Sequence, residues 1–243
     1  MQNQYDPRTT GVNTATVGVP RAARDAGLRS YMLSVYNYMA SGVLLTGIVA
    51  LLFANSGLAA QVLVTPLRWL IILAPLGFVM AMSFGLNRMS TATLQGLFWA
   101  FAVAMGLSMS SIFLVYTGVS IAQTFFAVAA GFVGLSLYGY TTKRDLSGFG
   151  TFLIMGVVGL LVAMLINLFL QSPAMMFAIS AIGVLLFAGL TAYDTQKIKS
   201  VYYSVAGHGE AMAKSAVIGA LNLYIDFINL FLFLLRFMGN RRN

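Results

Sequence analysis

The chain has 243 residues, of which 59% are hydrophobic and only 8% are charged, with a formal net charge of +8. This composition excludes a soluble globular protein and indicates one that crosses a membrane several times. With no cysteine and one histidine, His208, the chain cannot form disulfides, thiolate metal sites or histidine clusters. The basic residues are scattered at the ends of apolar runs, so we expect no nucleic acid among its partners.

Residues 1–30 are polar and basic and show no apolar periodicity, so we expect a flexible N-terminal tail before a single transmembrane domain at 31–243. Seven apolar runs follow, each near the ~20 residues that cross a hydrocarbon core about 30 Å thick. The predicted helices lie at about 33–54, 67–86, 93–116, 119–140, 149–170, 174–193 and 215–237. Their short connections favour antiparallel neighbours. The sequence therefore predicts an all-α integral membrane protein with a seven-helix bundle.

The basic residues also predict the orientation of the chain. With the N-terminus in the cytoplasm, ten of the 14 Lys and Arg residues fall on the cytoplasmic side and four fall outside. Three of those four, Arg236, Arg241 and Arg242, follow the last apolar run. Seven full crossings leave them outside, whereas a re-entrant last segment brings them in, so the side of the C-terminus stays open.

The second predicted helix contains a proline, Pro75, in its interior. Proline removes a backbone donor and bends a helix. Pro75 can therefore be a hinge that lets the helix bend between its outer end and Arg88. The alternative is a static kink.

An acidic residue, Asp226, lies within the last apolar run, LNLYIDFINLFLFLLRF. An ionised carboxylate in lipid is costly unless it faces a partner or water, so such a residue marks a functional site. The helical spacing places it on one face with small and polar residues, which lets another helix approach closely, so we expect this stripe to face the bundle interior. The stripe consists of Ser215, Gly219, Asn222, Asp226 and Asn229. The alternative is that Asp226 is protonated and only hydrogen-bonds a neighbouring helix.

A second acidic residue, Asp194, lies at the edge of the sixth apolar run, in LFAGLTAYDTQKIK. Alone it is also consistent with a solvated residue or a cap at the inner end of that helix. As a partner for Asp226, it would place two carboxyl groups on two membrane helices.

These residues carry a family resemblance. The segments AYDTQKI at 192–198, YIDFINLFLFLLRF at 224–237 and SSIFLVYTG at 110–118 resemble the Bax inhibitor-1 family, the transmembrane BAX-inhibitor-motif proteins, and its bacterial members. The similarity covers residues 30–240, and the two aspartate motifs are specific as a pair. The resemblance implies six helices around a central seventh in the bacterial cytoplasmic membrane.

The resemblance further implies a pH-sensitive calcium leak, gated by a di-aspartyl pair with a nearby arginine. Asp194 and Asp226 match the two aspartates, and Arg88, in the looser motif SFGLNRMS, is the candidate arginine. A topology-setting basic residue in a cytoplasmic loop is the alternative for Arg88.

Physical chemistry gives this arrangement a mechanism. Two neighbouring carboxyl groups share a proton and titrate as a unit, so acidity can act as a switch. An ionised pair would hold Arg88 in a closing bridge that protonation loosens. Oxygen ligands suit Ca²⁺, but two carboxylates are too few for a tight site, which fits transient binding of a transported ion. No cofactor is expected, and the expected partners are lipids, calcium and protons.

Other functions remain as alternatives. One alternative is a regulatory membrane protein that acts on a membrane protease, another membrane protein or a cell-death or stress pathway without transport of its own. A proton-coupled cation antiporter is a further alternative. An aspartyl protease requires a Gly-x-Gly-Asp turn, whereas Asp226 follows Tyr224-Ile225. A rhomboid-like protease requires a histidine in the membrane, whereas His208 lies in a polar loop. We therefore do not expect an enzyme.

Overall fold

A computed structural model describes residues 21–242, and this part of the chain is almost entirely helical. Seven of its helices are long and apolar enough to cross a membrane. The helices are α1 (Arg21–Asn55), α2 (Leu58–Val62), α3 (Leu67–Gly85), α4 (Thr91–Val115), α5 (Gly118–Thr141), α6 (Ser147–Leu170), α7 (Pro173–Val205) and α8 (Gly209–Met238). The predicted all-α membrane bundle is therefore confirmed.

The boundaries of three helices differ from those that hydropathy predicts. Helix α1 begins at Arg21, so residues 21–30 of the predicted tail are helical, and residues 1–20 lie outside the described residues. Helix α7 continues to Val205 rather than ending near residue 193, and α8 begins at Gly209 rather than near residue 215. Polar residues end the hydropathy signal at these points without ending the helix.

The polar extension of α7 is held by the end of α5 and by the connection between α5 and α6. Gln196 accepts a hydrogen bond from the Leu146 amide at 2.9 Å and donates one to the Arg144 carbonyl at 2.8 Å. Lys199 donates to the carbonyl of Tyr140 at 2.7 Å. These polar side chains interrupt the apolar pattern of α7 because they bind the backbone of neighbouring segments.

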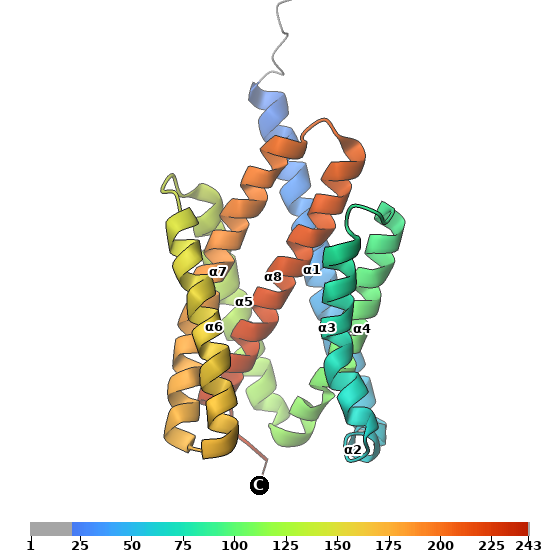
Figure 1. The fold of residues 1–243 in the computed structure, drawn as a ribbon, viewed down its shortest axis with the longest axis vertical. Helices are drawn as coiled ribbons and strands as arrows, with labels where there is room; N and C mark the ends of the chain where they lie inside the picture. Colours follow the sequence, from blue (N-terminus) through green and yellow to red (C-terminus); the bar gives the residue numbers. More distant parts are fainter. Residues whose placement is uncertain (1–20, 243) are drawn as a thin grey trace, which may run out of the picture.

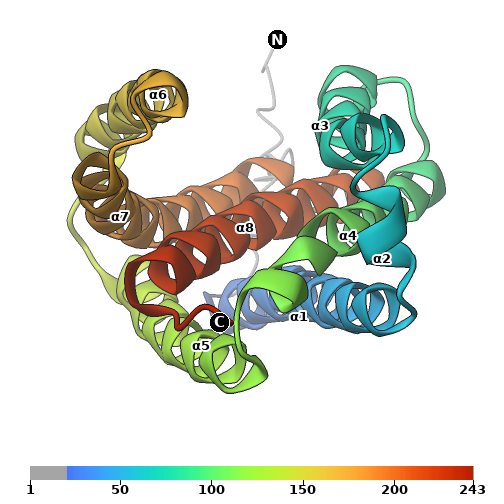
Figure 2. The same ribbon diagram turned by 90° about the horizontal axis from the view of Figure 1, so that it is seen from below.

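Helix α8 occupies the centre of the bundle. It packs against α1, α4, α5 and α7, and it is the most deeply buried of the seven spans. Helix α3 packs mainly against α4, and α6 packs mainly against α7. Figure 2 accordingly shows α8 in the middle and α3 and α6 at the outside of the assembly. The six surrounding helices are thus arranged as an inner group of four and two outer helices.

The two ends of the described chain lie at opposite ends of the bundle. In Figure 1, α1 starts at the top, whereas α8 runs down to the C-terminus at the bottom. A short antiparallel bridge between Tyr116 and Arg241 fixes the C-terminal segment against the connection between α4 and α5. Helix α8 is continuous and long enough to cross a membrane, which favours a full crossing over a re-entrant last segment, and the side of the C-terminus stays a prediction.

The kink residue Pro75 is buried inside α3, and α4 compensates for its missing backbone donor. A proline cannot donate to the carbonyl four residues earlier, which here belongs to Ile71. The hydroxyl of Ser108 on α4 donates to that carbonyl instead. A membrane helix needs such a partner because lipid supplies none. This contact favours the static kink, whereas a hinge at Pro75 stays a prediction.

Replacing Ser108 by alanine should destabilise the packing of α3 on α4, because the Ile71 carbonyl loses its donor. We expect a loss of about 1 kcal/mol in the free energy of unfolding. Ser111→Ala is the matched control, since the Ser111 hydroxyl bonds only to its own helix, at the Ser108 carbonyl. Thermal unfolding in detergent measures both variants. Equal stability of the two would contradict this role for Ser108.

Candidate functional site

The candidate site is built on Asp226, which lies in the middle of α8. Its side chain is only 4% exposed, and its Oδ2 atom is the one buried side-chain polar atom without a hydrogen-bond partner among the described residues. Buried carboxyl oxygens normally have partners, because leaving one unpaired is costly. Asp226 is therefore the most unusual polar group in the described part of the bundle.

Asp194 lies opposite Asp226, on α7. The two side chains approach each other across the interface between α7 and α8 closely enough for each to act on the other. Asp194 is half-buried, and the cation that acts on it lies one turn further along the same helix, at Lys197. The structure thus brings the two predicted aspartates together, and it places Asp194 inside a helix rather than at a cap.

The predicted stripe on α8 is buried in part. Gly219 is buried with Asp226, whereas Ser215, Asn222 and Asn229 are half-buried. A β-carbon at Gly219 would lie 3.2 Å from the Ile198 side chain, so this position sits tightly against α7. The stripe therefore combines a close approach to α7 with polar side chains nearer the edge of the interface.

The polar members of the stripe use different partners. Ser215 accepts a hydrogen bond from the Tyr31 hydroxyl of α1 at 3.2 Å. Asn229 donates to the Ile225 carbonyl of its own helix at 2.9 Å. Neither contact involves Asp194 or Asp226, so these residues support the helix rather than the carboxyl pair.

A buried polar contact fixes α8 two residues before Asp226. The Thr46 hydroxyl donates to the Ala102 carbonyl at 2.8 Å and lies 2.6 Å from the Tyr224 hydroxyl, which acts as the donor to Thr46. The Tyr224 ring also packs edge-on against Phe101, with centroids 5.0 Å apart. This contact joins α1, α4 and α8, and it sets the rotation of α8 that turns Asp226 toward α7.

Helix α5 closes the other side of α7 at the site. Ser136 of α5 accepts a hydrogen bond from Thr195, the residue after Asp194, at 3.5 Å. One turn further on, Gly139 of α5 touches the backbone of Ala192 on α7. Such an approach requires glycine, because any β-carbon would collide with the Ala192 carbonyl.

The proposed gate residue Arg88 lies apart from the aspartates. It occupies the exposed turn between α3 and α4, and within residues 21–242 it forms no ion pair with Asp194 or Asp226. Helix α3 packs mainly on α4, which separates this turn from α7. A role for Arg88 in gating stays a prediction, and in this conformation Lys197 is the cation near the pair.

The carboxyl pair has too few ligands for a tight metal site. The described residues contain no group of three or more His, Cys, Asp or Glu side chains that could hold a metal ion. Ca²⁺ normally takes six to eight oxygen ligands. The two aspartates could therefore contact a passing hard cation but could not retain it.

Asp145 provides a contrast outside the membrane-spanning helices. It precedes α6, where its carboxylate accepts a hydrogen bond from the Ser147 amide at 2.9 Å. Hydrogen bonding from the Ser147 side chain and backbone holds the pKa of Asp145 below its usual range. Asp145 therefore stays ionised in mild acid, and its contribution to stability is lost only as the pH falls through that lowered pKa.

The chain is similar to a known family over most of its length. A family profile described as "Inhibitor of apoptosis-promoting Bax1" matches residues 28–243. Protein RP147 of Rickettsia prowazekii is 49% identical over 220 residues, which cover 90% of this chain and 93% of the relative. The inner membrane protein YbhL of Escherichia coli K12 is 48% identical over 220 residues, which cover 89% and 94%. A membrane protein of Streptococcus pyogenes is 37% identical over 221 residues, which cover 88% and 94%.

Adding a methyl group at Gly139 should push α5 away from α7 beside the carboxyl pair. We expect Gly139→Ala to lower the free energy of unfolding by about 1–3 kcal/mol, as overpacking does elsewhere. Gly134→Ala on the same helix is the control, because a β-carbon there meets nothing within 4 Å. Thermal unfolding in detergent tests both. A Gly139→Ala protein as stable as Gly134→Ala would show that the close approach is not required.

Proposed function

The chain belongs to the Bax inhibitor-1 family, and on that premise we propose that it is a pH-sensitive cation leak, with calcium as its ion. The carboxyl groups of Asp194 and Asp226 would form both the proton sensor and the narrowest polar point of the pathway. The name of the YbhL relative supports the bacterial inner membrane as its location.

The unpaired Oδ2 atom of Asp226 is the observation that carries this proposal. If Asp226 only joined two helices, an asparagine would do so without the cost of ionisation. A carboxyl group that keeps one oxygen unpaired in the protein interior is instead free to take up a proton, water or a cation. An unpaired buried polar atom is rare in proteins, and a functional role is one of the reasons for which it is retained.

Protonation would act on the interface between α7 and α8. Two interacting carboxyl groups can share one proton, so the protonation of the pair follows the pH as one unit. A second proton changes both the charge of the pair and its attraction to Lys197. Because α7 and α8 meet at this pair, the change would shift the balance between a closed and a separated arrangement of the two helices.

Calcium fits this pathway as a transported ion. Carboxylate oxygens are the ligands that Ca²⁺ prefers, and two of them attract the ion without completing its coordination shell. Conduction requires binding weak enough for the ion to leave again. The described conformation would be the closed one, because Asp226 is only 4% exposed.

A regulatory role without transport is the competing function. Such a role does not need an ionisable pair. It would depend on the N-terminal tail, of which residues 1–20 lie outside the described residues. Deleting residues 1–20 separates the two functions. A leak that persists after the deletion supports transport as a property of the helical domain.

Replacing both carboxyl groups of the pair should remove the pH response. Wild-type protein in liposomes should admit calcium faster in mild acid, by up to about tenfold per pH unit for one titrating proton. Asp194→Asn combined with Asp226→Asn should make the calcium flux independent of pH, because no carboxyl pair remains to titrate. A fluorescent calcium indicator inside the liposomes measures the rate.

The matched control for this experiment is Asp145→Asn. It removes an exposed carboxylate that stays ionised in mild acid, so the pH response should be that of wild type. The thermal stability of each variant establishes that it folds. A folded double variant that leaks like wild type at every pH would overturn the sensor.

The two candidate gate cations can be compared directly. If Lys197 stabilises the closed pair, Lys197→Ala should change the pH at which the leak opens, whereas Arg88→Ala should not. Opening by Arg88→Ala alone would instead assign the gate to Arg88, through an arrangement of α3 different from the described one. The same liposome flux measurement, made across pH, distinguishes the outcomes.

A further inference from the structure

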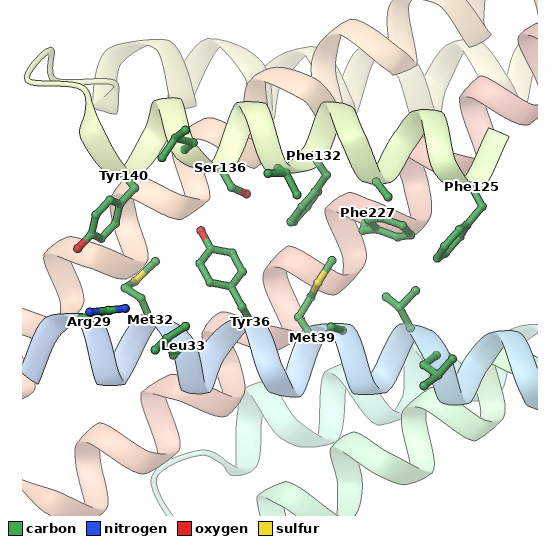
Figure 3. Close-up of a pocket in the computed structure, with 16 residues that line it drawn as sticks. Arg29, Met32, Leu33, Tyr36, Met39, Phe125, Phe132, Ser136, Tyr140 and Phe227 are labelled. Atoms are coloured by element: carbon green, nitrogen blue, oxygen red, sulfur yellow. The ribbon is translucent and has the colours of Figure 1, made fainter. Parts of the chain in front are cut away.

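A long apolar groove separates α1 from α5 on one side of the bundle. It has a volume of about 670 Å³, and Phe227 of α8 contributes to its wall. Figure 3 shows the side chains of α1 and α5 facing each other across it, with Arg29 and Tyr140 at one end and Phe125 toward the other. Neither Asp194 nor Asp226 lines this groove.

The groove opens toward the surrounding bilayer. Four large apolar side chains along it are at least half exposed, two from each helix: Leu33, Leu44, Val133 and Leu137. On a membrane-spanning surface, such side chains face lipid rather than water. A concave apolar surface in this place will be filled by an apolar chain from the bilayer.

The groove is long enough to span the hydrocarbon depth of one leaflet. Its lining on α1 runs from Arg29 to Leu44, so its two ends are separated by about 22 Å along the helix at ~1.5 Å per residue. Half of the hydrocarbon core is about 15 Å thick. The groove can thus accept an acyl chain over the full depth of a leaflet, with its charged end at the membrane surface.

The charged end of the groove favours an anionic headgroup. Arg29 is exposed and forms no ion pair within the described residues, even with Asp25 one turn earlier. Lys199 lies beside Tyr140, with its Nζ atom 5.0 Å from the centre of that ring. Arg29 in the lining, with Lys199 behind Tyr140 and bonded to the Tyr140 carbonyl, makes this end of the groove positive. A positive charge at the surface end of an apolar groove complements a phosphate group above an acyl chain.

We propose that the groove between α1 and α5 binds an anionic phospholipid of the leaflet at the N-terminal end of the bundle. The phosphate contacts Arg29 and lies near Lys199 and Tyr140, and one acyl chain lies along the groove against Phe227. A zwitterionic lipid fills the groove less tightly, because its ammonium group opposes the two cations.

The occupant of the groove would touch the support of the carboxyl pair. Phe227 follows Asp226 on α8, and Ser136, which lines the groove, contacts Thr195 next to Asp194. Figure 3 shows the Tyr36 hydroxyl directed across the groove toward Ser136. An effect of the lipid on the leak rests on the proposed function, whereas lipid binding itself does not.

Native mass spectrometry of the full-length protein with added phosphatidylglycerol or phosphatidylcholine tests the binding. Wild-type protein should retain phosphatidylglycerol preferentially. Arg29→Ala should weaken its retention by about fivefold, the effect of one basic residue near an anionic headgroup. Arg68→Ala removes an exposed arginine at the other end of the bundle and should leave retention unchanged.

A second pair of variants tests the groove itself. Ala129 lines the groove, whereas its neighbour Ala130 is exposed on the same helix and does not. Ala129→Phe should abolish the retained phosphatidylglycerol, and Ala130→Phe should preserve it, with thermal unfolding confirming that both fold. The proposal is overturned if wild-type protein retains the two lipids equally, or if the two phenylalanine variants retain phosphatidylglycerol equally. It is also overturned if the protein is a dimer that carries no bound lipid and that Ala129→Phe disrupts.

Discussion

A carboxyl group in the dry interior of a helical bundle requires a partner, and Asp226 finds its partner in Asp194 on the neighbouring helix. Much of the bundle serves to keep these groups opposed. Gly219 brings α8 close to α7, the contact between Tyr224 and Thr46 fixes the rotation of α8, and Gly139 holds α5 against α7. The central position of α8 follows, because its polar groups must be shielded from lipid on all sides.

The backbone of the outer helices obeys the same constraint. Lipid offers no hydrogen bonds, so a carbonyl freed by a proline must find a donor within the protein. Ser108 supplies it for the kink at Pro75 and thereby joins α3 to α4. The polar contacts of this bundle therefore satisfy groups that the membrane cannot, and the remaining unpaired oxygen on Asp226 stands out against them.

The sequence was sufficient to predict the spans and to single out Asp226, because one acid in an apolar run is visible without a structure. The end of α7 was predicted too early, since Gln196 and Lys199 resemble loop residues although they bind the end of α5 and the connection that follows it. Lys197 could have been found from its spacing of three residues after Asp194. Contacts such as Thr46 with Tyr224 could not, because 178 positions separate them and no local pattern joins them.

The groove between α1 and α5 and the carboxyl pair lie on two sides of the same short segment of α8. Phe227 faces the groove while Asp226 faces α7, so a rotation of α8 at this point would alter both. A lipid bound in the groove would therefore contact the segment of α8 that carries Asp226.

The most direct test of the central claim is a pH titration of the two carboxyl groups by carbon NMR, on aspartate-labelled protein in lipid bilayers. The signals are assigned with the single variants Asp194→Asn and Asp226→Asn. If the groups form one proton-sharing unit, removing either carboxyl will change the titration of the other. If each carboxyl titrates identically with and without its neighbour, the two aspartates are independent and the proposed sensor is contradicted.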